Sequence, residues 1–233
     1  MERSDLWDFT GHTMIRVAPN CSEYQETLDR ARVLVSGERR DVAVEHLDRY
    51  LSDFDGAWFD RLMDSEHPNE FTPVDFVAVS KLRVNVLRKA RPWLIGEGHA
   101  EVESLLAKIP NDKDIWDVDV AEYDHLLGRD SAAWTLWNLI FDQQKGAGRS
   151  GRGVTAGKLL HGKRPRLIPI YDDQAVRPAL RVTAANVWEA LWCTLRHPDI
   201  RDRLAEIQAS VPSAADLSIL RVLDIVTWMS VQP

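Results

Sequence analysis

The segment from Gly146 to Pro165 combines glycines with basic side chains in a spacing that suits a bound phosphate group. It reads GAGRSGRGVTAGKLLHGKRP, and we expect a basic loop followed by a helix that opens at Val154 or Thr155. Glycines leave backbone N–H groups exposed, so the loop and the first helical turn can point several donors at one anion. The candidate phosphate contacts are Gly151, Arg152, Gly153, Thr155, Lys158, Lys163 and Arg164.

Charge is distributed unevenly along the chain. The formal net charge is −7, which argues against a protein that coats nucleic acid by bulk attraction. Residues 145–181, however, include nine basic and two acidic side chains, a net charge of +7, so the remainder carries −14. This asymmetry indicates an anionic partner, most commonly phosphate; the alternative is a solvated loop kept soluble by its charge.

Several other site classes lack their sequence signatures. The Walker pattern GxxxxGK[ST] is absent, and a helix rather than a strand precedes the glycines, which argues against a dinucleotide site. The seven histidines are scattered without metal-ligand spacing, and no GxSxG or HExxH signature occurs. We therefore expect neither a metal nor another cofactor.

The order of elements around the glycines resembles the helix-hairpin-helix DNA glycosylases. A helix is followed by a Gly-rich turn, by Thr155-Ala156 and Leu159-Leu160, and by an apolar connector into Pro169-Ile170-Tyr171-Asp172. The spacing from Thr155 to Asp172 matches that of the endonuclease III branch, which implies that Asp172 is the catalytic aspartate. Asp173 is the substitute if the register is shifted by one. The resemblance also implies that double-stranded DNA is the partner.

Two departures from the family pattern concern the hairpin itself. The family's hairpin glycines correspond to Ser150 and Arg152, whereas this chain has Gly151 and Gly153, so the turn is shifted or degenerate. The strand-cleaving branch carries a lysine where this chain has Val154, which implies a monofunctional enzyme that leaves an abasic site. The alternative is that another amine, such as Lys158, substitutes for that lysine. Separately, the segments AGKLL, KRPRLIPIYD and LSILRVLDIVTWM resemble an uncharacterised actinobacterial family without an assigned activity.

The chemistry implied is hydrolysis of the N-glycosidic bond of a flipped nucleotide. An ionised Asp172 would stabilise oxocarbenium charge on the sugar and orient the attacking water, with Arg177 or Arg181 keeping the carboxylate charged. Tyr171 would stack on the flipped base, which is a damaged or phage-modified one, in a repair or antiviral role. Asp55 and Trp58 are weaker pocket candidates.

Three alternatives remain for this site. Asp172 is also suited to cap a surface turn as an ordinary N-cap residue. The whole segment also fits a non-catalytic DNA-binding module that kept a degenerate hairpin, or an enzyme that binds a small anionic ligand in a phosphate nest.

The elements that would position these residues are helices, and we expect an all-α fold. Apolar residues recur at helical spacing in the following ranges: 22–36, 41–54, 73–89, 99–109, 131–144, 154–161, 187–196, 199–211 and 213–231, the last capped by Ser213. RLIPIY reads as a buried extended connector. The chain forms one helical domain over residues 1–233 or two interlocked lobes with a cleft between them, and the hairpin and catalytic loop span about 131–181.

Cysteine usage and the N-terminus bear on the compartment. Cys21 and Cys193 are far apart, with no CxxC pair, so we expect two free thiols in a reducing compartment. The start, MERSDLWDF, lacks the features of a secretory signal, and no run of about 18 apolar residues occurs. These observations favour a soluble cytoplasmic protein without a membrane partner; they leave the oligomeric state open.

Overall fold

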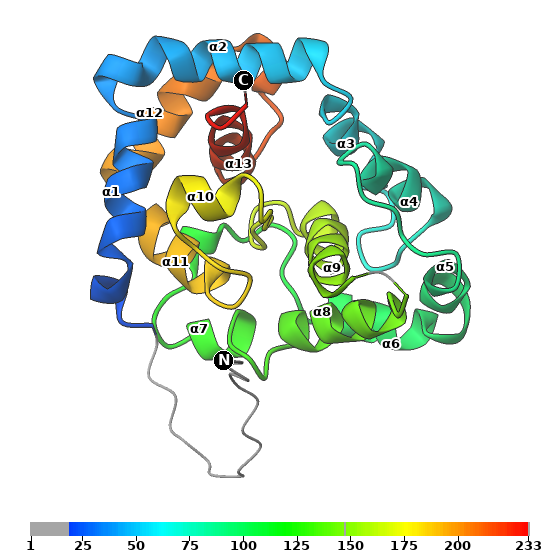
Figure 1. The fold of residues 1–233 in the computed structure, drawn as a ribbon. Helices are drawn as coiled ribbons and strands as arrows, with labels where there is room; N and C mark the ends of the chain where they lie inside the picture. The colour runs from blue at the N-terminus through cyan, green and yellow to red at the C-terminus, as the bar shows by residue number, and fades with distance from the viewer. Residues whose placement is uncertain (1–18, 147, 233) are drawn as a thin grey trace, which may run out of the picture.

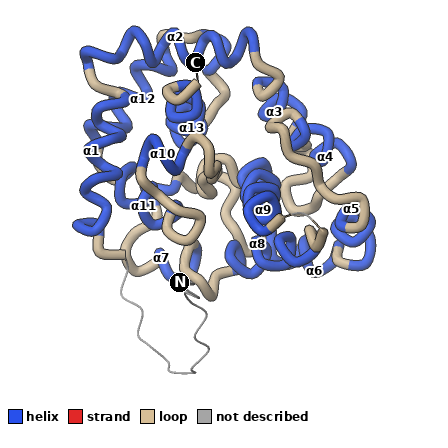
Figure 2. Tube along the Cα trace, in the orientation of Figure 1, coloured by secondary structure: helices blue, strands red, loops and turns tan. Residues whose placement is uncertain are grey.

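The computed structural model describes residues 19–146 and 148–232, and within these ranges the chain folds into helices joined by turns and loops (Figure 2). No strand occurs in the described part of the chain, so the expected all-α fold is confirmed. The residues before position 19, where no secretory signal was expected, lie outside this description. Among the helices described, none is both long and apolar enough to cross a membrane.

One group of helices joins the two ends of the chain. It contains α1 (Gln25–Leu34), α2 (Arg40–Asp53), α10 (Val176–Leu180), α11 (Val187–Leu195), α12 (Pro198–Ala209) and α13 (Ile219–Met229). In Figure 1, α2 lies across α12 and α13, and α1 lies beside α10 and α11. Short helical turns at Cys21–Tyr24, Gly37–Arg39 and Pro212–Ala214 complete this group. Ser218, rather than Ser213, caps α13, because its hydroxyl accepts a hydrogen bond from the Arg221 N–H.

The middle of the chain forms a second group. It contains α3 (Ala57–Leu62), α4 (Pro73–Ser80), α5 (Ala90–Pro92), a π-helical turn (Trp93–Glu97), α6 (His99–Leu106), α8 (Ala132–Gln143) and α9 (Arg149–Lys163). The turn Ile115–Asp117 and α7 (Tyr123–Leu126) precede α8. Helix α9 packs against α8 and α4 (Figure 1). Buried apolar residues from both groups form one continuous core.

The helix expected over residues 73–89 is wrong beyond Ser80. It begins as expected at Thr72-Pro73, where the Thr72 N–H donates to Asp75 Oδ2 at 2.8 Å. Arg83 then adopts a left-handed conformation with φ of 58°, which ends helical geometry. The Leu87 N–H donates instead to the Gln144 side chain at 3.0 Å, which fastens this segment to the turn after α8. The residues after Ser80 therefore form a loop.

The expected Gly-rich loop is also wrong, because α9 already begins at Arg149 and includes four of the glycines. Gly146 alone among the described glycines has a positive φ, of 118°, so the chain turns at Gly146, just after the end of α8. A Cβ atom at Gly153 would lie 3.2 Å from Trp137 of α8, and one at Gly162 would lie 2.4 Å from Met63. These glycines therefore permit close helix packing.

The two cysteines form a disulfide bond between the first helical turn and α11, with their Cα atoms 5.3 Å apart. The expectation of two free thiols is therefore wrong. Spacing along the chain could not reveal this pair, because the bond joins positions separated by 172 residues that meet only through tertiary packing. The argument from free thiols to a reducing compartment no longer holds.

Candidate functional site

A cleft of about 770 Å³ lies between the two groups of helices. Its walls come from the end of α2 and the following turn, from residues 80–84, from one face of α9, from residues 170–174 and from α13. Asp172, Asp173 and Val154 all line it. This volume is within the range of about 300–1,000 Å³ that is usual for ligand pockets.

Asp172 lies beside Lys158 on one wall of the cleft. The Lys158 Nζ atom is 3.5 Å from Asp172 Oδ2, and the two side chains are 8% and 21% exposed. Asp172 Oδ1 accepts a hydrogen bond from the Gln174 N–H at 2.8 Å. The partner of the carboxylate is thus Lys158, a residue expected on the DNA-binding surface, whereas the Arg181 guanidinium lies 3.8 Å from Glu26.

Lys158 is itself a buried amine. Its Nζ atom donates a hydrogen bond to the Leu82 carbonyl at 3.0 Å. Burial lowers the pKa of this amine below its ordinary value of 10.5, and the Asp172 carboxylate opposes that shift. The amine therefore holds the Asp172 side chain and the 80–84 loop together at the cleft wall.

Tyr171 does not have its expected place. Its hydroxyl donates a hydrogen bond to Asp173 Oδ1, and its ring is not among the groups that line the cleft. Burial raises the pKa of Tyr171 to about 12. The expected stacking of Tyr171 on a base is therefore not supported by its position.

Three aromatic residues from the end of α2 and from α13 form another part of the cleft wall. The Tyr50 and Phe54 rings stack with centroids 6.0 Å apart, and Trp228 meets them edge-on at 5.8 and 5.4 Å. All three line the cleft, as do Asp53 and Asp55 on either side of Phe54 in the chain. Asp55 thus lies at the cleft, as a pocket candidate should, whereas Trp58 is 49% exposed and outside its lining.

A buried ionic cluster lies beneath this aromatic wall. The Arg221 Nε atom contacts both carboxylate oxygens of Asp60 at 3.0 Å, and Arg221 Nη1 donates to Asp224. Arg221 Nη2 also donates to the Tyr50 hydroxyl at 3.0 Å. Burial raises the pKa of Asp224, although Arg221 acts against that shift. This cluster was not predicted from the sequence. The one feature that could have indicated it is an arginine on the apolar face of the last helix.

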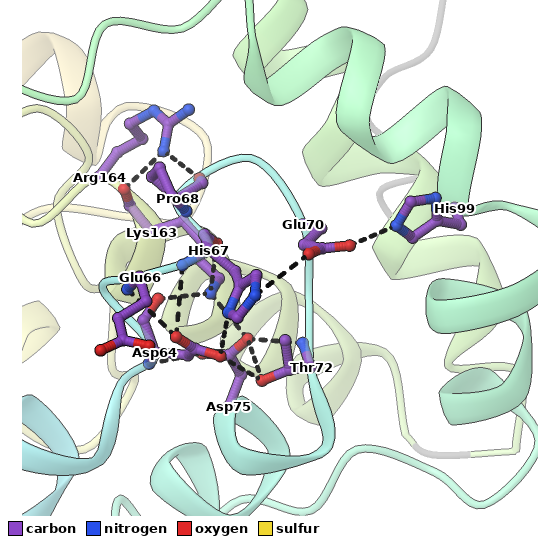
Figure 3. A network of polar contacts seen from close by, with 10 residues as sticks. All are labelled: Asp64, Glu66, His67, Pro68, Glu70, Thr72, Asp75, His99, Lys163 and Arg164. Carbon is purple, nitrogen blue, oxygen red and sulfur yellow. Dashed lines mark hydrogen bonds and ion pairs between the residues drawn. The ribbon is translucent and has the colours of Figure 1, made fainter.

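The other basic residues expected to contact phosphate are internal. Lys163 Nζ lies 2.8 Å from Asp75 Oδ2, and the side chains of this pair are 1% and 0% exposed. Arg164 donates to the carbonyls of Pro68, Leu106 and Ile109. In Figure 3 both basic residues anchor the loop between α3 and α4. The expectation that these two side chains face DNA is wrong, because each is buried with its own partners.

The remaining candidate phosphate contacts on α9 differ in how far they are open to solvent. The buried Thr155 hydroxyl donates to the Gly151 carbonyl one turn earlier, at 2.8 Å. The Arg152 guanidinium lies over the Phe141 ring at 4.3 Å, and Gly153 packs on Trp137. Gly151 lines the cleft, and a Cβ atom there would meet nothing within 4 Å. Of these four residues, Gly151 therefore has the most open position.

A basic edge extends from the cleft along the loop after α4 to the turn after α8. We give this name to the side chains of Lys81, Arg83, Arg88, Lys89 and Lys145. The first two line the cleft, and the other three are exposed. None of the five forms an ion pair with another residue in the described part of the chain. The edge was missed because its first four residues were placed on a helix.

Comparison with known families gives one match. A family model described as a family of unknown function, DUF6308, matches residues 43–231. Because the match covers most of the chain, the protein belongs to this family. No curated protein and no solved structure matched.

Proposed function

We propose that this member of the DUF6308 family is a monofunctional DNA glycosylase that hydrolyses the N-glycosidic bond of a flipped nucleotide. The observation that carries the proposal is the position of Asp172, which follows the α8–α9 hairpin in sequence and lines the cleft beside Lys158. A carboxylate at that place meets the chemical need of the reaction. It can stabilise positive charge that develops on the sugar and orient a water molecule for attack.

The cleft suits a base that has left the duplex. Flipping costs a few kcal/mol, and the cost is offset by contacts that the base and the flanking phosphates make with the protein. A volume of about 770 Å³ leaves room for a nucleoside with solvent around it. The Phe54 and Trp228 rings in the cleft wall offer a stacking surface.

The basic edge supports binding to duplex DNA in place of the buried residues that sequence reasoning selected. Lys81 and Arg83 line the cleft, and the other three side chains are exposed to solvent. The Leu87–Gln144 hydrogen bond keeps the 81–89 loop next to the end of α8. Lysine and arginine at such an edge bind phosphates without reading sequence. DNA docked there would place a flipped nucleotide near the mouth of the cleft.

Val154 supports a reaction that ends at the abasic site. The strand-cleaving branch of the family that this chain resembles has its amine at the corresponding position, and valine cannot form a Schiff base. The Lys158 amine also lines the cleft, but it is held by the Asp172 carboxylate and the Leu82 carbonyl. We therefore propose that the sugar remains in an intact strand until alkali breaks it.

The test is excision from duplexes that carry uracil, alkylated, oxidised or glucosylated bases, followed by alkali. We expect cleavage at one class of base only after alkali, with loss of at least a hundredfold in Asp172→Asn. Asp173→Asn serves as the register control and should remain active. No abasic product on any duplex, with duplex binding retained, would refute the enzyme and leave a non-catalytic DNA-binding module. Strand cleavage without alkali would refute the monofunctional assignment.

DNA binding has its own measurement. Replacing Arg83 and Lys89 by glutamine should weaken duplex binding and reduce the salt dependence of log K by roughly 0.9 for each phosphate that is no longer neutralised. Lys108→Gln, an exposed lysine outside the cleft and the basic edge, is the matched control. Equal affinity in all three proteins would refute docking at the basic edge.

A further inference from the structure

We propose that Lys81 and Arg83 form a subsite in the cleft for the phosphate group of a free nucleotide, a nucleoside 5′-monophosphate. The inference goes beyond docking at the basic edge, which concerns the phosphates of a duplex, and it does not require that the protein excise a base. Its evidence is the way in which the chain holds these two side chains at the cleft.

The first step is the geometry of the turn after α4. The Arg83 N–H donates to the Ser80 carbonyl at 3.0 Å, which closes the turn. Between the two basic residues, the Leu82 carbonyl accepts the hydrogen bond from Lys158 Nζ at 3.0 Å. Because both chain neighbours of Leu82 line the cleft, the bond to α9 fixes the turn that carries the two positive charges.

The second step is the backbone of Arg83. Its φ of 58° lies in the left-handed region, where a Cβ atom causes strain and glycine is the usual residue after a helix. Within the described part of the chain, its guanidinium forms no hydrogen bond or ion pair that would offset this strain. A strained residue whose basic side chain is uncommitted at a cleft points to a role in binding.

The third step is charge. Lys81 likewise has no ion-pair partner among the described residues, whereas the other two cations that line the cleft, Lys158 and Arg221, each lie within 3.5 Å of a carboxylate. Two uncompensated charges on one turn favour a ligand group with two negative charges. A phosphate monoester carries about 1.5–2 at pH 7, and a guanidinium can bind two of its oxygens. A phosphodiester of DNA carries only one charge and balances the turn less well.

Helix α9 adds positive potential along the same cleft. Gly151, Val154 and Lys158 all line it, and their spacing places them on one face of the helix. Gly151 belongs to the first turn, where backbone N–H groups have no acceptor within the helix and the helix dipole is positive. Since Lys158 fastens the basic turn to this face, an anion beside Lys81 and Arg83 lies along a helix that also favours negative charge.

The remainder of the cleft restricts what the phosphate is attached to. A volume of about 770 Å³ leaves room for a nucleoside, and Trp228 offers a partly buried aromatic surface. Five carboxylates also line the cleft, those of Asp53, Asp55, Asp172, Asp173 and Asp224. They can accept hydrogen bonds from hydroxyl and amino groups, but they repel further negative charge. A monophosphate therefore fits better than a di- or triphosphate.

The binding test uses free ligands at constant ionic strength, so that it does not depend on excision. By titration calorimetry, we expect deoxyadenosine 5′-monophosphate to bind at least tenfold more tightly than deoxyadenosine, and at least as tightly as the triphosphate. Equal affinity for nucleotide and nucleoside would overturn the inference. Tighter binding of the triphosphate would also overturn it, because affinity would then follow total charge rather than a fitted phosphate.

The methyl ester of the monophosphate distinguishes a free nucleotide from a nucleotide within a strand. Its phosphate is a diester with one negative charge, as in DNA. We expect it to bind at least threefold more weakly than the monophosphate. Equal affinity would assign the subsite to a nucleotide within a strand and overturn the assignment to free nucleotides.

Variants locate the phosphate. Arg83→Gly removes the guanidinium and suits the left-handed conformation, so the urea midpoint should be kept while the affinity for the monophosphate falls at least fivefold. Lys81→Gln should have a similar effect on affinity, whereas Lys108→Gln, an exposed change outside the cleft, should have none. Affinity for deoxyadenosine should be the same in all three variants. Full affinity for the monophosphate in Arg83→Gly and Lys81→Gln would overturn the inference.

Excision separates this inference from the proposed function. A protein that binds the monophosphate through Lys81 and Arg83 but releases no base from any duplex would support the subsite and refute the glycosylase. A protein that excises a base but binds the monophosphate no better than deoxyadenosine would refute the subsite alone.

Discussion

The Lys158 amine lies 3.5 Å from the Asp172 carboxylate and donates a hydrogen bond to the Leu82 carbonyl. A single nitrogen thus joins α9, the connector after it and the loop that carries part of the basic edge. Since both side chains line the cleft, the pair links the position of the proposed catalytic carboxylate to the wall on which DNA is proposed to dock.

The first prediction concerns the energy of this pair. Asp172→Asn leaves a buried ammonium without its counter-ion and should lower the free energy of unfolding by about 1–3 kcal/mol at pH 7. Lys158→Met/Asp172→Asn should recover part of that loss, which urea unfolding of the four proteins in a double-mutant cycle measures. Additive effects would show that the two groups do not interact.

The same pair has a pH dependence. Burial lowers the Lys158 pKa and Asp172 opposes this, so Asp172→Asn should lower it further. Between the lowered value and 10.5 the folded state binds fewer protons than the unfolded chain, so stability rises with pH there. Asp172→Asn should therefore regain stability relative to the unmodified protein as the pH rises from about 7 toward about 10.

The second prediction distinguishes a buried lysine from a DNA contact. Lys163→Met leaves the fully buried Asp75 without its ion partner and should cost about 3–5 kcal/mol of unfolding free energy. Lys108→Met changes an exposed side chain and should cost less than about 0.5 kcal/mol. If Lys163→Met kept full stability and reduced only the affinity for DNA, the surface position expected from the sequence would be correct after all.

The third prediction locates the hairpin turn. Gly151→Ala should raise the unfolding free energy by about 0.5–1 kcal/mol, because the residue is helical and its added Cβ meets open space. Gly146→Ala should lower the unfolding free energy, because φ is 118° there. Chemical denaturation measures the unfolding free energy of both variants. If Gly151→Ala were destabilising and Gly146→Ala stabilising, the turn would lie at the position expected from the sequence.

The helices were predictable where apolar spacing and caps agreed, as in α1, α2, α6 and α8. Prediction failed after Ser80 because Val79, Leu82 and Val86 repeat at helical spacing although the chain leaves the helix at Arg83. It failed at α9 because glycine suits a loop locally, whereas contact with Trp137 decides its use here.

The residues of the candidate site were also predicted only in part. Asp172 was chosen as the candidate catalytic residue because the order of elements in one continuous stretch of the chain resembles a known family. It does line the cleft. Phe54 and Trp228 were not selected, because they lie far apart in the chain and meet only when α2 packs against α13. The positions of Lys163 and Arg164 were predicted wrongly, because the sequence does not show which basic side chains find a buried acceptor in the folded protein.

The fourth prediction concerns pH and His161. This side chain is fully buried, donates to the Ile168 carbonyl, and has its pKa lowered by burial from 6.5 to about 4. The unfolded chain takes up the proton first as the pH falls, so stability present above pH 6.5 is lost toward pH 4, by on the order of 3 kcal/mol. Between about pH 7 and about pH 4.5, His161→Leu should lose less unfolding free energy than the unmodified protein. The control His125→Gln, at an exposed position, should lose as much as the unmodified protein. An equal loss in His161→Leu and the unmodified protein would contradict the role of His161.

The fifth prediction concerns the disulfide between Cys21 and Cys193, which closes a loop of most of the chain. Restricting the unfolded chain in this way should contribute about 2–5 kcal/mol. Cys21→Ser, at the partly exposed end of the bond, should therefore be less stable by that amount, and dithiothreitol should lower the unmodified protein to the same level while leaving the variant unchanged. Because neither cysteine lines the cleft, base excision by the folded variant should keep its rate. Equal stability with and without reductant would show that packing against α11, rather than the covalent bond, holds the first helical turn in place.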